Sequence, residues 1–304
     1  MKKTIHSILT AVVIVAIFVT AAACFGSEKP VSPTKYSQYT SEHSLTRDYT
    51  EEDYEKSAEL QEAIEEENRQ KIKKLLKSNM ELNCPDMSIE DIDVLLPQTP
   101  LGLACDLGDI ETVRQLLKKG AITKYIPGTT PVINCVLWEY NKGDLELIKL
   151  LIEHGASPAE PEVDYQKEFS PPIVSAAGLL PSWKKKTPGA EEEVTEIFKL
   201  LESMGGNIYD VSLYGKTTLI LAAQGNNLML LKYLVEEKHM DINHQTISGW
   251  TALMAAAWFD ETNERVKYLL EHGADKTIVN NYGQTALDVA IEKGIQENID
   301  LLSK

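Results

Sequence analysis

The chain has 304 residues, of which 43% are hydrophobic, 25% charged and 7% aromatic, and its formal net charge is -16. This balance is that of a protein with a folded apolar core. An acidic surface repels the phosphates of nucleic acids and the anionic faces of membranes, so both are poor partners. It favours a basic protein partner, although solubility is the commoner reason for such a charge.

The chain begins with the pattern of a bacterial export signal. Lys2 and Lys3 precede an uncharged apolar run over residues 8–19, and small residues follow as far as Ala23. This order predicts a signal peptide over residues 1–23. Cys24 resembles the acylated residue of bacterial lipoproteins, so we expect lipidation at Cys24 and attachment to a membrane of the cell envelope.

Two other interpretations of this segment stay open. Ala21-Ala22-Ala23 also fits an ordinary cleavage site, which would release a soluble secreted or periplasmic protein. An uncut anchor helix is the other, although the run is short for the roughly 20 residues that a span requires. Residues 24–54 are rich in Ser, Thr, Tyr and charge, and we expect them to form a flexible tether.

A short motif recurs in the remainder of the chain. Gly215, Gly249 and Gly283 lie 34 residues apart, and a threonine stands two positions after each. A fixed period of this size indicates stacked supersecondary units. Earlier segments place Thr99, Thr130 and Pro171 in the threonine slot.

Gly215-Lys216-Thr217 also has the form of the end of a phosphate-binding loop. Such a loop needs a second glycine five residues before the first, where this chain has Asp210. Because the motif lies in register with the other openings, we interpret Lys216 as a variable, solvent-side residue of a repeat. We expect no nucleotide binding.

A second helical pattern follows each opening. Apolar residues at i, i+3 and i+4 form one stripe of a helix, and glycine follows where a helix ends in the left-handed conformation. The triads begin at Ile72, Val113, Ile148, Ile197, Leu231 and Val266. Small residues on the preceding helix, such as Ala222 and Ala256, let the two helices approach closely. Each unit is therefore predicted to be a helix, a turn, a helix and an extended loop.

The stretches "QTPLGLACDLGDIETVRQLLKKGA" and "GWTALMAAAWFDETNERVKYLLEHGAD" resemble the ankyrin-repeat family. The resemblance covers residues 55–304 and implies an all-α repeat solenoid of about seven ankyrin repeats, in a curved stack with a concave binding face. The terminal units are atypical, as expected where one face meets water. An irregular insertion is expected near residues 178–193.

No constellation for chemistry is predicted. Cys105 and Cys135 occupy small-residue slots, and a disulfide between them would have to join neighbouring repeats, which stack too far apart for an easy bond. His239 and His244 straddle a loop without the spacing of a metal-binding helix. The triple glutamate at residues 191–193 is interpreted as helix-surface charge. We therefore expect no catalytic residue, no metal site and no cofactor.

Binding of a protein partner is the predicted function. On the concave face, aromatic residues at the ends of first helices are the candidate contacts: Trp138, Tyr140, Trp258 and Phe259. Trp250 is interpreted as local packing instead. Second helices, with charges such as Glu111, Arg114 and Lys118, should form the convex back. The rival hypothesis is an effector or enzyme whose activity lies in the tether or the insertion, which is too short for a catalytic constellation.

Overall fold

The computed structural model describes residues 49–85, 98–124, 130–138, 140–158, 170–180, 187–212, 214–225 and 227–304. All of them belong to one compact unit, His43–Lys304. The predicted signal peptide, Cys24 and most of the predicted tether lie outside the described residues.

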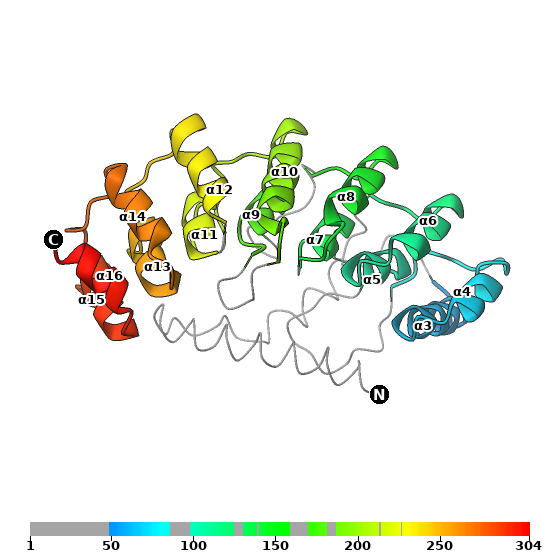
Figure 1. Cartoon of the computed structure of the whole chain (residues 1–304). Coiled ribbons are helices and arrows are strands. Elements are labelled where there is room, and N and C mark those ends of the chain that lie inside the picture. The colour runs from blue at the N-terminus through cyan, green and yellow to red at the C-terminus, as the bar shows by residue number, and fades with distance from the viewer. Residues whose placement is uncertain are drawn as a thin grey trace. The chain divides into compact units, whose positions relative to one another are not determined.

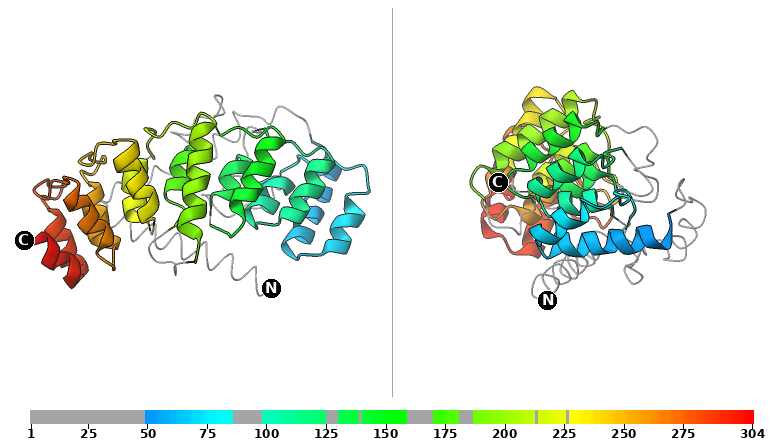
Figure 2. Two further views of the ribbon diagram at one scale, coloured as in Figure 1. Left: turned by 45° about the horizontal axis from the view of Figure 1, so that its top comes forward. Right: turned by 90° about the vertical axis from the view of Figure 1, so that its right-hand side faces the viewer.

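The described residues form seven helix pairs in chain order, and successive pairs lie side by side (Figures 1 and 2). Consecutive first helices pack on one another, and consecutive second helices form a separate row. We call the surface on the side of the first helices the first-helix face. The pairs are α3 (Glu51–Glu65) with α4 (Arg69–Leu75), α5 (Pro100–Asp106) with α6 (Ile110–Lys118), α7 (Val132–Val136) with α8 (Asp144–Glu153), α9 (Pro172–Ala177) with α10 (Ala190–Ser203), α11 (Thr218–Gln224) with α12 (Leu228–Lys232), α13 (Ala252–Phe259) with α14 (Glu264–Glu271), and α15 (Ala286–Lys293) with α16 (Gln296–Leu302).

The recurring threonine is the N-cap of a first helix. Thr99, Thr217, Thr251 and Thr285 each accept a hydrogen bond from the backbone N–H three residues later, at 3.1 to 3.3 Å. This bond satisfies one of the donors that a helix start leaves open. The third unit departs from the pattern, because the N-cap of α7 is Pro131 and not Thr130. Pro171 is the N-cap of α9, as its slot predicts.

The first unit begins earlier than predicted. Helix α3 starts at Glu51, four residues before the start that we expected near Glu55. The cause is a capping box, in which Thr50 and Asp53 satisfy one another's backbone N–H groups. Tyr49 adds a tertiary contact, since its hydroxyl donates to the Asn83 carbonyl at 3.1 Å.

The insertion is also shorter than predicted at its C-terminal end. Residues 190–193 are not irregular but form the first turn of α10. Gly189 precedes them with φ of 81°, and three glutamates follow in that turn, where the helix dipole favours negative charge. Residues 181–186 of the predicted insertion lie outside the described residues.

The predicted stripes make the core. The residue that begins each triad is buried, as are Ala222, Ala223, Ala256 and Ala257. The cysteines of the described residues, Cys84, Cys105 and Cys135, are buried and free of disulfides. The segments that the structure describes contain no helix both long and apolar enough to cross a lipid bilayer.

The fifth unit differs from its neighbours in its second helix. Glycines with φ near 90°, such as Gly155 and Gly273, end the second helices of other units. In the fifth unit His239 occupies this place with φ of 52°. A π-helical turn, η2 (Tyr233–Glu237), precedes it and takes up one residue beyond the 33 of a typical ankyrin repeat.

Candidate functional site

Trp138 is the most exposed of the four candidate contact residues. It follows the end of α7 and keeps 50% of its surface exposed. Leu107, which holds the same place after Thr99 that Trp138 holds after Thr130, is 46% exposed on the neighbouring unit. Because α5 and α7 pack side by side, these two exposed side chains come from the ends of neighbouring first helices.

Tyr140 is already engaged within the chain. It is half-buried, and its hydroxyl donates to Glu193 Oε2 of α10 at 2.7 Å. Burial, and then the carboxylate of Glu193, raise the pKa of Tyr140. This hydrogen bond restrains the Tyr140 ring, which limits the entropy that a partner would have to remove.

Trp258 and Phe259 are half-buried at the end of α13. The indole of Trp258 meets that of Trp250 edge-on, with centroids 6.3 Å apart, and the Lys293 ammonium lies 5.1 Å from its centroid. The Phe259 carbonyl accepts a hydrogen bond from Arg265 at 3.1 Å. Trp250 itself is 2% exposed, which confirms its role in local packing.

The Trp250–Trp258 contact belongs to a row of three equivalent pairs. In the fifth, sixth and seventh units, the residue immediately before the N-cap threonine contacts the residue seven positions after that threonine. The Lys216 ammonium donates to Gln224 Oε1 at 2.9 Å, and the Gln284 amide donates to Glu292 Oε2 at 2.7 Å. The row joins each loop to the end of the first helix of the same unit.

Lys216 is therefore not the solvent-side residue that we predicted. It is half-buried, and burial lowers the pKa of its ammonium to about 8. Gly215 donates its N–H to the Ser212 carbonyl at 2.8 Å, and Thr217 caps α11. These backbone and side-chain groups support the repeat and are not arranged around a phosphate.

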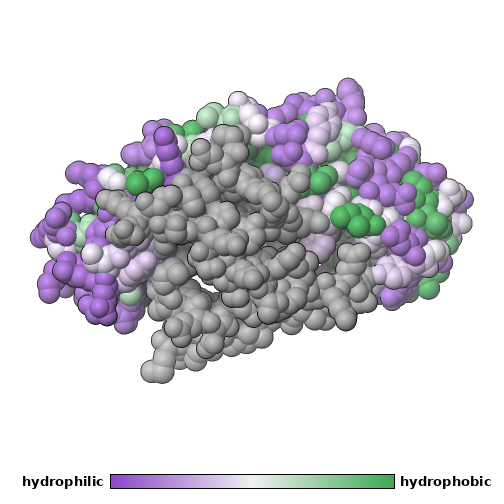
Figure 3. All heavy atoms as spheres, turned by 180° about the vertical axis from the view of Figure 1, so that it is seen from behind, coloured by the Kyte–Doolittle hydropathy of each residue, from purple (hydrophilic) through white to green (hydrophobic). Residues whose placement is uncertain are grey.

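The loop tips of the last three units carry exposed apolar side chains that sequence reasoning missed. We call Tyr209, Tyr214, Ile247, Val279 and Tyr282 the tip residues; each is between 48% and 64% exposed. Neighbouring tips are hydrogen-bonded, since Ile247 N–H donates to the Tyr214 carbonyl and Asn281 N–H to that of Ser248. The available signal was the position before the recurring glycine, which holds tyrosine in two of the three units, as Tyr214 and Tyr282. On the coloured part of the face seen in Figure 3, apolar patches lie among mainly hydrophilic residues.

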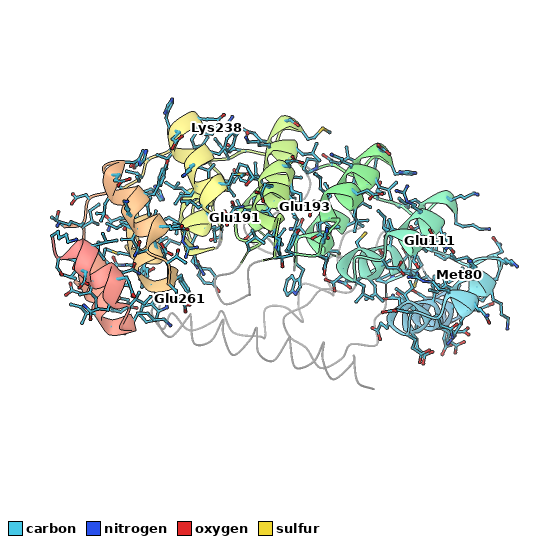
Figure 4. All side chains as sticks on the ribbon, viewed as in Figure 1. Met80, Glu111, Glu191, Glu193, Lys238 and Glu261 are labelled. Carbon is cyan, nitrogen blue, oxygen red and sulfur yellow. The ribbon has the colours of Figure 1, made fainter. Side chains whose placement is uncertain are left out.

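The first turn of α10 contacts both neighbouring units. Glu193 Oε1 accepts hydrogen bonds from Gly143 N–H at 2.9 Å and Leu145 N–H at 3.2 Å, at the start of α8. Glu191 Oε2 accepts one from Leu228 N–H at 3.2 Å, at the start of α12. Figure 4 shows the two glutamates on opposite sides of this end of α10. They are therefore capping groups as well as surface charge.

The histidines and acids show no arrangement for metal chemistry within the described segments. There, no group of three or more His, Cys, Asp and Glu could hold a metal ion. His154 and His272 place Nδ1 within 2.9 Å of a carbonyl of their own helix. His239 is exposed, and its backbone conformation identifies it as the end of a helix.

Stacked helix pairs, threonine-capped first helices and extended loops define a helical repeat protein that offers binding surfaces. Residues 58–162, 190–279 and 219–304 match the model of a family described as "Ankyrin repeats (3 copies)". These matches cover most of the sequence, so the chain belongs to the ankyrin-repeat family. The all-α ankyrin solenoid that we predicted is confirmed.

Individual relatives share only part of this chain. Over 78 residues it is 47% identical to ankyrin repeat and SAM domain-containing protein 6 of Rattus norvegicus, covering 25% of this chain and 9% of that protein. It is 31% identical over 96 residues to the putative ankyrin repeat protein YahD of Escherichia coli, covering 30% of this chain and 48% of that protein. The chain thus spans less than half the length of either relative.

Among solved structures, the human ASB11 ankyrin repeat domain superposes with a TM-score of 0.56 at 21% identity, over 80% of this chain and 96% of that one. This likeness is one of fold. Ankyrin repeats generally bind protein partners, and the fold is typically non-enzymatic.

Proposed function

We propose that this ankyrin-repeat chain is an exported, non-enzymatic interaction module that binds a protein partner on its first-helix face. The exposed side chains of Leu107 and Trp138, at the ends of neighbouring first helices, are the observation that carries the proposal. Exposed aromatic side chains on a rigid surface are the usual anchors of protein interfaces. Trp258 and Phe259 would contribute a second contact, and Tyr140 would support Trp138 from its bonded position.

The place of action proposed is a membrane of the bacterial cell envelope, reached through an acylated Cys24. The charged start, apolar run and small residues before Cys24 support this part. A soluble secreted or periplasmic protein that acts as an effector or protective factor for another protein is the alternative. The net charge of -16 favours a partner with a basic surface in either case.

The tip residues favour a second contact surface for the same partner. The segment 245–259, which includes the loop tip at Ile247, contains no charged residue, and neither does the segment 277–287 around Tyr282. Interface cores are depleted in charge and enriched in tyrosine, which matches these tips. Their mutual hydrogen bonds also organise them before binding.

The test is capture of the partner by crosslinking in the native envelope, followed by binding titrations with purified variants. Trp138→Ala should weaken binding about thirtyfold, the effect of losing roughly 2 kcal/mol at an anchor. Trp258→Ala and the pair Tyr214→Ala with Tyr282→Ala locate the other contacts. The matched control is Glu111→Lys with Lys118→Glu on α6, which should change the Kd little. Thermal melts confirm that each variant is folded.

The outcome decides between faces. If folded Trp138→Ala and Trp258→Ala bind as wild type does while the α6 reversal abolishes binding, the partner contacts the second helices and the proposed face is wrong. If only the tyrosine pair weakens binding, the loop tips are the principal site.

A further inference from the structure

The junction between the third and fourth units contains two carboxyl groups at one helix start. Glu193 of α10 holds the first turn of α8 through Gly143 N–H and Leu145 N–H, and it accepts the Tyr140 hydroxyl on its other oxygen. Asp144 is the residue between those two amides, and its side chain lies at the same turn. Its Oδ2 accepts the Asn141 N–H at 2.7 Å.

The two carboxyl groups differ in their surroundings. Asp144 is 2% exposed, whereas Glu193 is half-buried and collects three donors. Burial, followed by the charge of Glu193, raises the pKa of Asp144 to about 7, against a hydrogen bond from Asn141 that lowers it. Asp144 thus changes charge near neutral pH, next to a carboxylate that ties two units together.

The titratable groups around Asp144 come from three elements. Glu193 approaches from α10, Tyr140 from the connection before α8, and Cys105 from α5. The charge of Asp144 contributes to raising the pKa of both Tyr140 and Cys105, so these two groups stay neutral near pH 7, and Glu193 is the neighbour whose charge opposes ionisation of Asp144.

We propose that this junction is a pH-responsive joint between the third and fourth units. While Asp144 is neutral, Glu193 alone occupies the start of α8, and its three hydrogen bonds hold the joint closed. Ionisation of Asp144 places a like charge beside Glu193, weakens those bonds and loosens the connection that carries Trp138 and Tyr140. The joint is therefore firm in mild acid and looser above neutral pH.

This sign follows from the direction of the pKa shift. A carboxyl group whose pKa is raised in the folded chain stays protonated there while the same group in the unfolded chain ionises. The folded junction consequently loses stability as pH rises from the ordinary aspartate range to about 7, and the loss is complete above it. The joint acts through the chain alone, so it does not depend on whether Trp138 binds a partner.

The test uses the full chain and the fluorescence of Trp138, which stands beside the joint. The signal is the tryptophan fluorescence of wild type minus that of Trp138→Phe, recorded from pH 5 to pH 9. We expect a one-proton transition with a midpoint near 7. Asp144→Asn should abolish the transition, and Glu193→Gln should strongly reduce its amplitude, because ionised Asp144 then meets no like charge. Glu146→Gln, which changes an exposed acid on the same helix, is the control and should leave the midpoint in place.

Three results would overturn the proposal: no transition in wild type, a transition that persists unchanged in folded Asp144→Asn, or one that Glu193→Gln leaves at full amplitude. Persistence in Asp144→Asn would show that a group other than Asp144 titrates. If Asp144→Asn does not fold, the loss of amplitude in Glu193→Gln decides alone, since it depends on the interaction of the two carboxyl groups.

Discussion

Trp250 and Trp258 form an edge-on pair that joins a loop to the end of the helix that follows it, with an interplanar angle of 74°. Trp250 is almost fully buried, while Trp258 is half-buried and faces Lys293. The two indoles therefore show a division of roles. Trp250 packs within the sixth unit, and Trp258 exposes part of its surface.

This division predicts different stability costs for the two truncations. Trp250→Ala should lower the free energy of unfolding by about 3–5 kcal/mol, as expected for a large aromatic side chain removed from a core. Trp258→Ala should cost about 1–2 kcal/mol, because only part of its surface is buried and the aromatic contact is lost. Urea denaturation followed by circular dichroism measures both. Equal costs for the two variants would contradict the division.

A substitution at His239 should stabilise the chain. Its φ of 52° is unfavourable for a side chain with a Cβ, and glycine holds this place in other units. His239→Gly should raise the free energy of unfolding by about 0.5–1 kcal/mol, after the greater flexibility of unfolded glycine is subtracted. The mirror control is Gly273→Ala, where φ is 90° and no atom obstructs a Cβ, so any loss is conformational. A destabilised His239→Gly variant would show that the histidine side chain stabilises the fifth unit.

Lys216 should make stability depend on pH in the alkaline range. Burial lowers the pKa of this ammonium to about 8, so the folded chain releases the proton before the unfolded chain does. Stability should therefore rise between about pH 8 and the ordinary lysine pKa, and it should be lowest and constant below pH 8. Lys216→Met keeps most of the apolar stem and should be more stable than wild type at pH 7 by about 1 kcal/mol, the lost bond to Gln224 offsetting part of the gain.

The stability advantage of Lys216→Met over wild type should shrink as pH approaches 10.5. Thermal melts of wild type, Lys216→Met and the control Lys118→Met measure this trend. Lys118 is exposed on α6, so its variant should show no such trend. A Lys216→Met advantage that is independent of pH would mean that apolar packing, and not the charge, is responsible. The same variant tests the nucleotide hypothesis: saturable ATP binding by wild type that disappears in it would show our interpretation of Gly215-Lys216-Thr217 to be wrong.

The proposed anchor gives a separate prediction. If Cys24 is acylated, the intact mass of the native protein should lack residues 1–23 and carry added fatty chains. Cys24→Ser should then move from the membrane fraction to the soluble fraction. Recovery of wild type as a soluble protein without the modification would support ordinary secretion, and retention of an uncut chain would support the anchor helix.

Local patterns carried most of what could be predicted. A threonine cap, an apolar triad and a glycine stop each act within a few residues, so Thr217, Leu231 and Gly273 could be placed from spacing alone. Because these signals repeat, the number of units and the all-α class followed from them.

Contacts between units could not be predicted in this way. Glu193 reaches Tyr140 and Gly143 across the unit boundary, and no local pattern marks such a bond. The burial of Lys216 arises within its own unit, where the loop lies against the end of α11, and the three-residue motif does not indicate this contact either. His239 raised the question of metal binding through its pairing with His244, and only its positive φ shows that it ends a helix where other units have glycine.

The first turn of α10 also limits how far this array can be treated as modular. Repeat units can in general be removed or duplicated, because each contacts only its neighbours through similar surfaces. Here Glu193 completes the start of α8 and Glu191 completes the start of α12, so the fourth unit supplies a different group to each side. Excising it would expose donors at two helix starts at once, and a consensus repeat in its place would restore neither. Recombination between ankyrin genes should therefore tolerate breakpoints on either side of the fourth unit poorly.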